Sequence, residues 1–146
     1  MKIQRHTELT VYKQAFDTAM QIFEASRSFP KEETYSLTDQ IRRSSRSVAT
    51  SIAEGWRRRK YEAAFVNKLS EAESETAETQ SWLEFAVKCC YLKAEPAREL
   101  HKRYDRLIGK LVNMGNNPAP WVLRKSAGKL KVAPAYRPTR LPANGL

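Results

Sequence analysis

Residues 60–92 read KYEAAFVNKLSEAESETAETQSWLEFAVKCCYL, and this segment decides which fold the chain adopts. Apolar or small residues recur in it at near-heptad spacing, a pattern typical of helices that pack at shallow angles. These residues are Phe65, Leu69, Ala72, Thr76, Thr79, Leu83, Val87 and Cys90. A helix over the whole segment would be roughly 45–50 Å long. We therefore expect one long helix within a helical bundle.

A second stripe runs beside the first on the same predicted helix. It contains three apolar residues, Trp82, Phe85 and Cys89. Three acids that precede them in the chain, Glu71, Glu75 and Glu78, lie in the same sector of the helix. A helix with apolar residues on two sides usually buries both, so the second side needs a partner and we predict that these six residues form an oligomer interface. A wide core face within a monomer is the alternative. The three acids also fit a solvated face or salt-bridge partners.

Three other segments carry the 3.6-residue apolar period of amphipathic helices. Residues 9–26 place Tyr12, Phe16, Ala19 and Phe23 in one stripe, and Pro30 follows as a stop signal. Residues 36–55 begin at a potential N-cap, Ser36, and reach Gly55, a potential end or kink. Their expected core positions are Leu37, Ile41, Ser45, Val48 and Ile52.

The last periodic segment covers residues 95–114, with the stripe Leu100, Tyr104, Leu107, Leu111 and Met114. Gly115-Asn116-Asn117-Pro118 is expected to end it. Four helices with short connections predict an all-α, antiparallel up-and-down four-helix bundle. We assign the bundle to residues 1–117 and a basic, proline-containing tail to residues 118–146. The tail is expected to be largely flexible and partly docked through Trp121.

The composition of the chain indicates the cellular compartment in which the protein is expected. Hydrophobic residues make up 41% and charged residues 29%, which is typical of a globular chain. No apolar run approaches the ~20 residues that a membrane-spanning helix needs, and the N-terminal residues do not form a signal peptide. The two cysteines, Cys89 and Cys90, are adjacent and would point about 100° apart on a helix, so nothing indicates an oxidising compartment. We expect a cytoplasmic protein without a membrane partner.

The net charge of +10 is unevenly distributed. Residues 115–146 contain six Lys or Arg and no acid, so this part carries +6 of the total. A strong positive balance favours polyanionic partners such as RNA or DNA. Simple solubility would also account for it.

Signatures of enzymes are missing from the sequence. It has no glycine-rich phosphate loop, no G-x-S-x-G and no H-E-x-x-H. His6 and His101 lie in different segments without ligand-like spacing to the cysteines, and a di-iron bundle would need Glu-x-x-His pairs that the chain lacks. We predict no catalytic activity, no cofactor and no metal.

Arginines carry the clearest binding signal. The planar guanidinium donates two hydrogen bonds together to a phosphate, and a neighbouring Trp56 or Tyr61 could stack on an unpaired base. The predicted nucleic-acid-binding residues are Arg42, Arg43, Arg46, Trp56, Arg57, Arg58, Arg59, Lys60, Arg124, Lys125, Lys129 and Lys131. For Arg42 and Arg46, pairing with the acids of residues 60–92 in a neighbouring copy is an equal alternative.

Three motifs resemble a known family. They are Leu9-x-Val11-Tyr12-x-x-Ala15; Phe29-Pro30-x-Glu32-x-x-Tyr35-x-Leu37-x-x-Gln40-Ile41-Arg42-Arg43-Ser44; and Ser47-Val48-Ala49-x-Ser51-Ile52-Ala53-Glu54-Gly55. They resemble the four-helix-bundle family named after open reading frames in 23S ribosomal RNA intervening sequences. That family includes the accessory variability determinant proteins of diversity-generating retroelements. The likeness continues through Phe65, Leu69, Ala72 and Ser74-Glu75 and covers roughly residues 9–114. Ser51 departs from the asparagine that is common at its position.

The resemblance implies a homopentameric barrel without catalytic residues. In the retroelement members, this barrel binds a reverse transcriptase and nucleic acid. The first hypothesis is therefore a non-enzymatic, homo-oligomeric RNA- or DNA-binding adaptor that serves as an accessory subunit of a reverse transcriptase. The second is a protein-binding scaffold of the intervening-sequence type with no nucleic-acid ligand.

Overall fold

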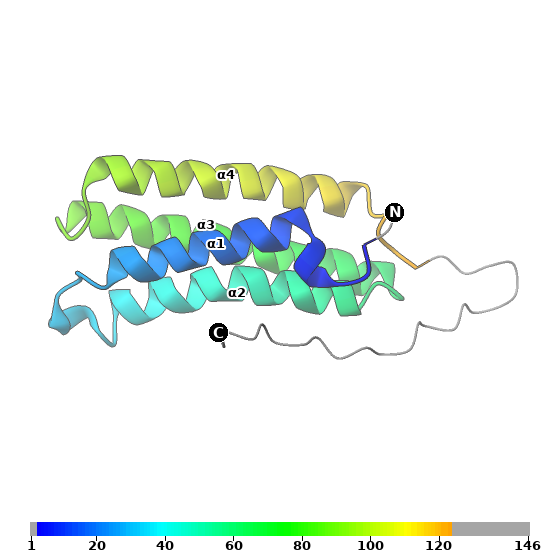
Figure 1. The fold of residues 1–146 in the computed structure, drawn as a ribbon, viewed down its shortest axis with the longest axis horizontal. Coiled ribbons are helices and arrows are strands. Elements are labelled where there is room, and N and C mark those ends of the chain that lie inside the picture. Colours follow the sequence, from blue (N-terminus) through cyan, green and yellow to red (C-terminus); the bar gives the residue numbers. More distant parts are fainter. Residues whose placement is uncertain (1–2, 124–146) are drawn as a thin grey trace, which may run out of the picture.

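The computed structural model describes residues 3–123, and these form an antiparallel four-helix bundle (Figure 1). The helices are α1 (Thr10–Ser26), α2 (Leu37–Arg57), α3 (Glu62–Lys88) and α4 (Ala94–Asn116), with single 3-10 turns η1 (His6–Glu8) and η2 (Lys31–Glu33). Each helix packs on the next one in the chain, and α1 also contacts α4. The described residues contain no strand, so the predicted all-α, up-and-down bundle is confirmed. None of these helices combines the length and the apolar content needed to cross a membrane.

The core forms where the apolar stripes of the four helices meet. All five residues predicted for the stripe of α2 and all five predicted for α4 are buried. On α3 the prediction holds from Phe65 to Leu83. Burying each large side chain of this kind contributes roughly 1.5–3 kcal/mol of transfer free energy. The stripes therefore supply the main driving force for the bundle.

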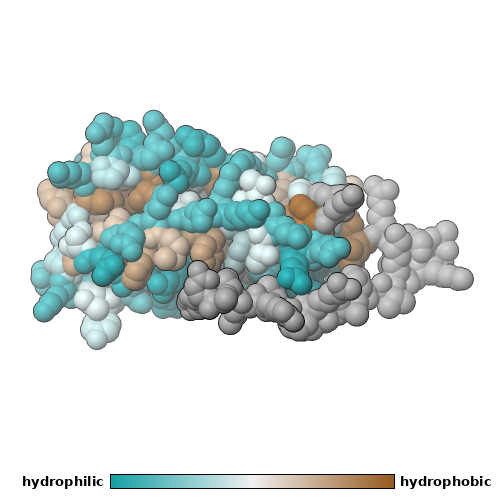
Figure 2. Space-filling model, viewed as in Figure 1, coloured by the Kyte–Doolittle hydropathy of each residue, from teal (hydrophilic) through white to brown (hydrophobic). Residues whose placement is uncertain are grey.

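The predicted stripe on α1 holds for Ala19, which is buried, and is wrong for Phe16, which is exposed. The core positions are Val11, Ala15 and Ile22, whereas Phe16 is 39% exposed and Tyr12 and Phe23 are half-buried. Phe23 lies under Arg42 and Arg46 of α2, and Tyr12 and Phe16 follow on the same helical face of α1. In the face shown in Figure 2, apolar surface in brown also breaks through the polar surface at the left end, where α3 connects to α4.

Helices α2 and α3 approach each other closely near Gly55. A Cβ atom on this glycine would lie 3.1 Å from Cβ of Lys68, which is tighter than ordinary van der Waals contact. The helix continues through Gly55 and ends at Arg57, two residues beyond the predicted end, and the glycine makes room for α3. Farther along the same interface, the hydroxyl oxygens of Ser44 and Thr79 are 2.8 Å apart.

The N-terminus of α2 uses Ser36 differently from the prediction. Ser36 occupies the N-cap position, but its hydroxyl makes no capping hydrogen bond. It donates to Oε1 of Glu33 at 2.8 Å, and the same oxygen accepts from the backbone N–H of Leu37 at 3.4 Å. The Glu33 carboxylate therefore supplies the acceptor for the start of the helix.

The C-terminus of α3 comes earlier than predicted because the chain turns there in a Schellman motif. The N–H of Tyr91 donates to the carbonyl of Ala86 at 2.9 Å, and the N–H of Cys90 donates to that of Val87 at 3.0 Å. Cys90 has φ of 62°, the left-handed conformation that usually belongs to glycine. The predicted core position of Cys90 is therefore wrong, and its side chain is exposed.

We expect Cys90→Gly to raise the free energy of unfolding by about 1 kcal/mol, because glycine adopts this conformation without the Cβ clash. Cys90→Ala is the matched control, since it removes the thiol and keeps the clash. Urea unfolding under reducing conditions measures both variants. Equal stability of the glycine and alanine variants would contradict the prediction.

Candidate nucleic-acid interface

The predicted arginines lie in two places. Arg42 and Arg46 are on the surface shared by α1 and α2, whereas Arg57, Arg58 and Lys60 are exposed at the turn from α2 to α3. Figure 1 shows that this turn lies at the same end of the bundle as the C-terminus of α4. Leu123, the last described residue, therefore lies at the end that carries the cations of the turn.

Arg42 is held in place by α1. Its Nε donates to Oγ of Ser26 at 2.7 Å, and the Ser26 hydroxyl in turn donates to the carbonyl of Phe23 at 2.9 Å. The Arg42 guanidinium lies over the Phe23 ring, 4.8 Å from its centroid. Arg27 and Arg46 lie over the same ring at 5.8 Å each. Three cations therefore converge on one aromatic ring, and Ser26, Phe23 and Arg27 were not among the predicted binding residues. Their spacing along one face of α1 was the available signal.

Arg42 and Arg46 have no carboxylate of residues 3–123 within 4.0 Å. Arg27 pairs with Glu24 at 3.6 Å and Arg43 with Asp39 at 3.8 Å, and both pairs are exposed. Such exposed pairs are screened by solvent and contribute little. The α1–α2 surface therefore presents positive charge that its own acids do not neutralise.

Trp56 and Arg59 have structural positions. Trp56 is only 3% exposed, so the prediction that its ring stacks on a base is wrong. The Arg59 guanidinium lies 3.5 Å from the centroid of the Trp56 ring, and its Nε donates to the Trp56 carbonyl at 2.8 Å. Burial, with the neighbouring Arg57 charge, lowers the pKa of Arg59. Tyr61, the other predicted stacking residue, is 68% exposed.

The segment after α4 folds back onto this end of the bundle. The backbone N–H of Leu123 donates to the carbonyl of Arg59 at 3.0 Å, and Nη1 of Arg59 donates to the carbonyl of Trp121 at 3.5 Å. Trp121 packs against the core, which confirms its predicted docking. The other predicted tail residues, Arg124, Lys125, Lys129 and Lys131, lie outside the described residues.

The second stripe of α3 is open on the surface of the subunit. Phe85 is 56% exposed, so a wide monomer core does not account for it, and Cys89 is exposed as well. Trp82 is half-buried, with its ring centroid 5.8 Å from that of Phe85. Its indole nitrogen is buried without an acceptor among the described residues. This part of α3 therefore offers aromatic surface to a partner.

The acids above these aromatics are crowded. Burial raises the pKa of Glu75, and the charges of Glu78 and Glu71 raise it further, while Arg43 acts in the opposite direction. Glu71 pairs with Lys68 at 2.8 Å, but Glu75 and Glu78 have no cation of residues 3–123 within 4.0 Å. A cation from another molecule would relieve this repulsion.

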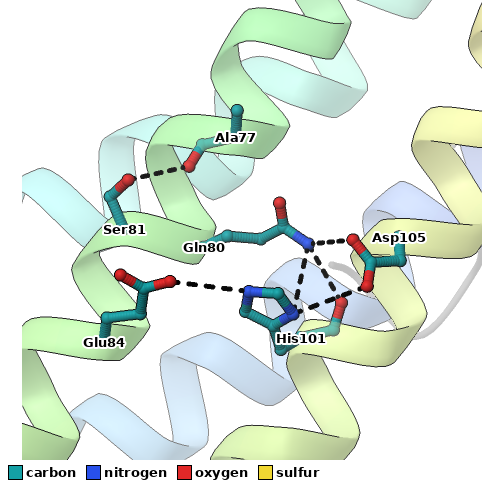
Figure 3. Close-up of polar contacts among 6 residues, drawn as sticks. All are labelled: Ala77, Gln80, Ser81, Glu84, His101 and Asp105. Carbon is teal, nitrogen blue, oxygen red and sulfur yellow. Dashed lines mark hydrogen bonds and ion pairs between the residues drawn. The ribbon is translucent and has the colours of Figure 1, made fainter.

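A polar cluster joins α3 to α4 (Figure 3). The Gln80 amide donates to Oδ1 of Asp105 at 2.9 Å and to the backbone carbonyl of His101 at 3.1 Å. The His101 ring lies 3.6 Å from Asp105 and 3.8 Å from Glu84. Within residues 3–123, no cluster of three or more His, Cys, Asp or Glu side chains is arranged to hold a metal ion. This cluster cross-links two helices, and His101 lies half-buried at its edge.

Comparison with known proteins places the chain in a family. The family model described as 23S rRNA-intervening sequence protein matches residues 7–113, which span all four helices. The chain belongs to this family. A crystal structure from the S23 ribosomal protein family of Bacteroides thetaiotaomicron, a protein of unknown function, shares the fold of this 23S rRNA-intervening sequence protein with a TM-score of 0.65. The two are 24% identical, and the match covers 72% of this chain and 97% of that one. Among curated proteins, none matches the chain.

Proposed function

We propose that this chain is a non-enzymatic, homo-oligomeric adaptor of the cytoplasm that binds RNA or DNA. One observation carries the proposal: five cations on α2 and the turn after it have no carboxylate of residues 3–123 within 4.0 Å. They are Arg42, Arg46, Arg57, Arg58 and Lys60. Residues 42–58 span about 24 Å at the helical rise, which suits a row of phosphates better than a single small anion.

The rest of the chain supports a polyanionic partner. The net charge is +10, and six further basic residues without any acid follow the bundle. The name of the family refers to 23S rRNA, which gives the proposal a ribosomal-RNA context. The likeness to the accessory variability determinant proteins suggests a reverse transcriptase as the protein partner.

The proposed assembly is the homopentameric barrel of the resembled family, closed through α3. Phe85 and Trp82 would supply the apolar part of the interface, and Glu71, Glu75 and Glu78 the polar part. An interface between copies would cover aromatic surface that the single subunit leaves in water. It would also repeat the cations of α2 around a ring, which raises the avidity for one polyanion.

The salt dependence of binding tests the proposed function. Five phosphate contacts predict that affinity for a nucleic acid falls on the order of 10²-fold between about 50 and 200 mM salt, because each contact releases counterions. Fluorescence anisotropy with labelled RNA and DNA oligonucleotides measures this slope for the full chain. Undetectable binding at the lower salt would remove the nucleic-acid ligand and leave a protein-binding scaffold.

A further inference from the structure

The surface shared by α1 and α2 combines aromatic rings with three guanidinium groups, of which two have no carboxylate of residues 3–123 within 4.0 Å. We define the aromatic–arginine strip as Tyr12, Phe16, Phe23, Arg27, Arg42 and Arg46. We propose that this strip binds single-stranded nucleic acid in preference to a duplex, with the phosphates on the arginines and unpaired bases on Phe16 and Tyr12. This inference rests on the proposed function and adds to it the class of strand and the surface that selects it.

The phosphate-binding half of the strip is preorganised. Arg42 uses Nε to hold Ser26, which is buried, and the ring of Phe23 supports its guanidinium. The four N–H groups on its two terminal nitrogens make no hydrogen bond with residues 3–123 and suit two phosphate oxygens. Because the side chain is already ordered in the free protein, binding a phosphate costs little further conformational entropy.

The base-binding half of the strip continues along α1. The Tyr12 and Phe16 rings have centroids 6.0 Å apart with a 35° angle between their planes, and Phe16 is 39% exposed. Met20, 49% exposed, extends the apolar surface toward Phe23. Stacking an unpaired base on such a ring is worth roughly 1–3 kcal/mol, and a duplex keeps its bases stacked on each other. The exposed Phe16 ring and the half-buried Tyr12 ring beside it therefore favour a single strand, whereas the arginines attract both forms.

The positive charge of the strip favours a nucleic acid over another copy of the chain as its binding partner. The strip presents three arginines, and only Arg27 has a carboxylate of residues 3–123 within 4.0 Å. A single strand supplies a phosphate with every nucleotide along the row. The crowded acids of α3 in a second copy are the competing occupant, so the experiment must also measure the oligomeric state.

The test compares labelled 12-nucleotide single strands, RNA and DNA, with duplexes of the same length, using the full chain at about 50 mM salt. We expect single strands to bind at least about 10-fold more tightly. Phe16→Ala should weaken single-strand binding about 5- to 10-fold and leave duplex binding unchanged, and Phe16→Trp should retain the preference. Arg42→Ala should weaken both, and Arg106→Ala, an exposed arginine on α4 without an ion pair among the described residues, should change neither.

Three other results would contradict either the strip as a single-strand site or the proposed function. Equal binding of both forms, or no effect of Phe16→Ala on single strands, overturns the strip as a single-strand site while the proposed function stands. Loss of the oligomer in Phe16→Ala or Arg42→Ala, with far-ultraviolet circular dichroism unchanged, assigns the strip to a second copy instead. No binding of any strand by the wild type rejects the proposed function itself.

Discussion

Phe85→Glu is expected to convert the assembled protein into folded monomers. Phe85 is 56% exposed on α3, so its replacement removes little from the core of the subunit. In the proposed assembly, the new carboxylate would enter an apolar contact next to Trp82, where no cation would pair with it. An unpaired charge buried at an interface costs about 2–5 kcal/mol, so association should weaken on the order of 10²-fold or more.

Sedimentation velocity at several protein concentrations measures this change, with circular dichroism as the check on folding. Val112→Glu is the matched control, because it places the same charge at a 37% exposed apolar position on α4. Trp82→Glu should act in the same direction, but Trp82 is half-buried and packs against the core, so its replacement also strains the subunit. A wild type that is monomeric at micromolar concentration, or a Phe85→Glu variant that stays assembled, would reject α3 as the interface.

The sequence predicts α2 and α4 well because each carries a single apolar period. Every expected core residue on these helices is buried. On α1, two sets of apolar residues follow the helical period, one with Ala15 and one with Phe16. The set with Phe16 contains the aromatic rings, yet the set with Val11, Ala15 and Ile22 is the one that is buried. Periodicity alone could not choose between them.

Local sequence patterns show neither where α3 ends nor that Trp56 is buried. A left-handed residue ends α3, but Cys90 stands where a glycine would have marked the stop. Trp56 follows Gly55, a residue that favours a helix end, but the helix continues to Arg57 and the indole is buried in the core. Arg59, three residues later, stacks on this indole, and its Nη1 donates to the carbonyl of Trp121 from the distant segment after α4.

For the candidate binding residues, the sequence identifies the arginines but not the contacts that hold them. Composition and local charge identified Arg42, Arg46, Arg57 and Arg58, because an arginine-rich helix and its turn are visible in the sequence. The support that Arg42 receives from Ser26 and Phe23 crosses from α2 to α1. It depends on the register between two helices, which only the folded chain defines.

Reversing the charge of the exposed turn arginines should separate binding from folding. We expect the double variant Arg57→Glu/Arg58→Glu to weaken nucleic-acid binding on the order of 10²-fold at about 100 mM salt, because two phosphate contacts are lost and two repulsions are added. Its salt slope should fall by about 1 to 2, in proportion to the contacts removed. Both side chains are exposed, so thermal unfolding and sedimentation should match the wild type.

Arg59→Glu tests the opposite role at the neighbouring position. Its guanidinium stacks on the buried Trp56 and donates to the carbonyl groups of Trp56 and Trp121, so replacement should lower the thermal midpoint.

The turn variant Arg57→Glu/Arg58→Glu needs a control for its change in net charge. This control is Lys102→Glu/Arg106→Glu, two exposed residues of α4 that have no ion pair among the described residues. If this control loses as much affinity as the turn variant, binding follows the total charge of the chain and not this surface. If the turn variant keeps its affinity for RNA and DNA, Arg57 and Arg58 do not contact phosphate, and their positive charge belongs to the recognition of an acidic protein.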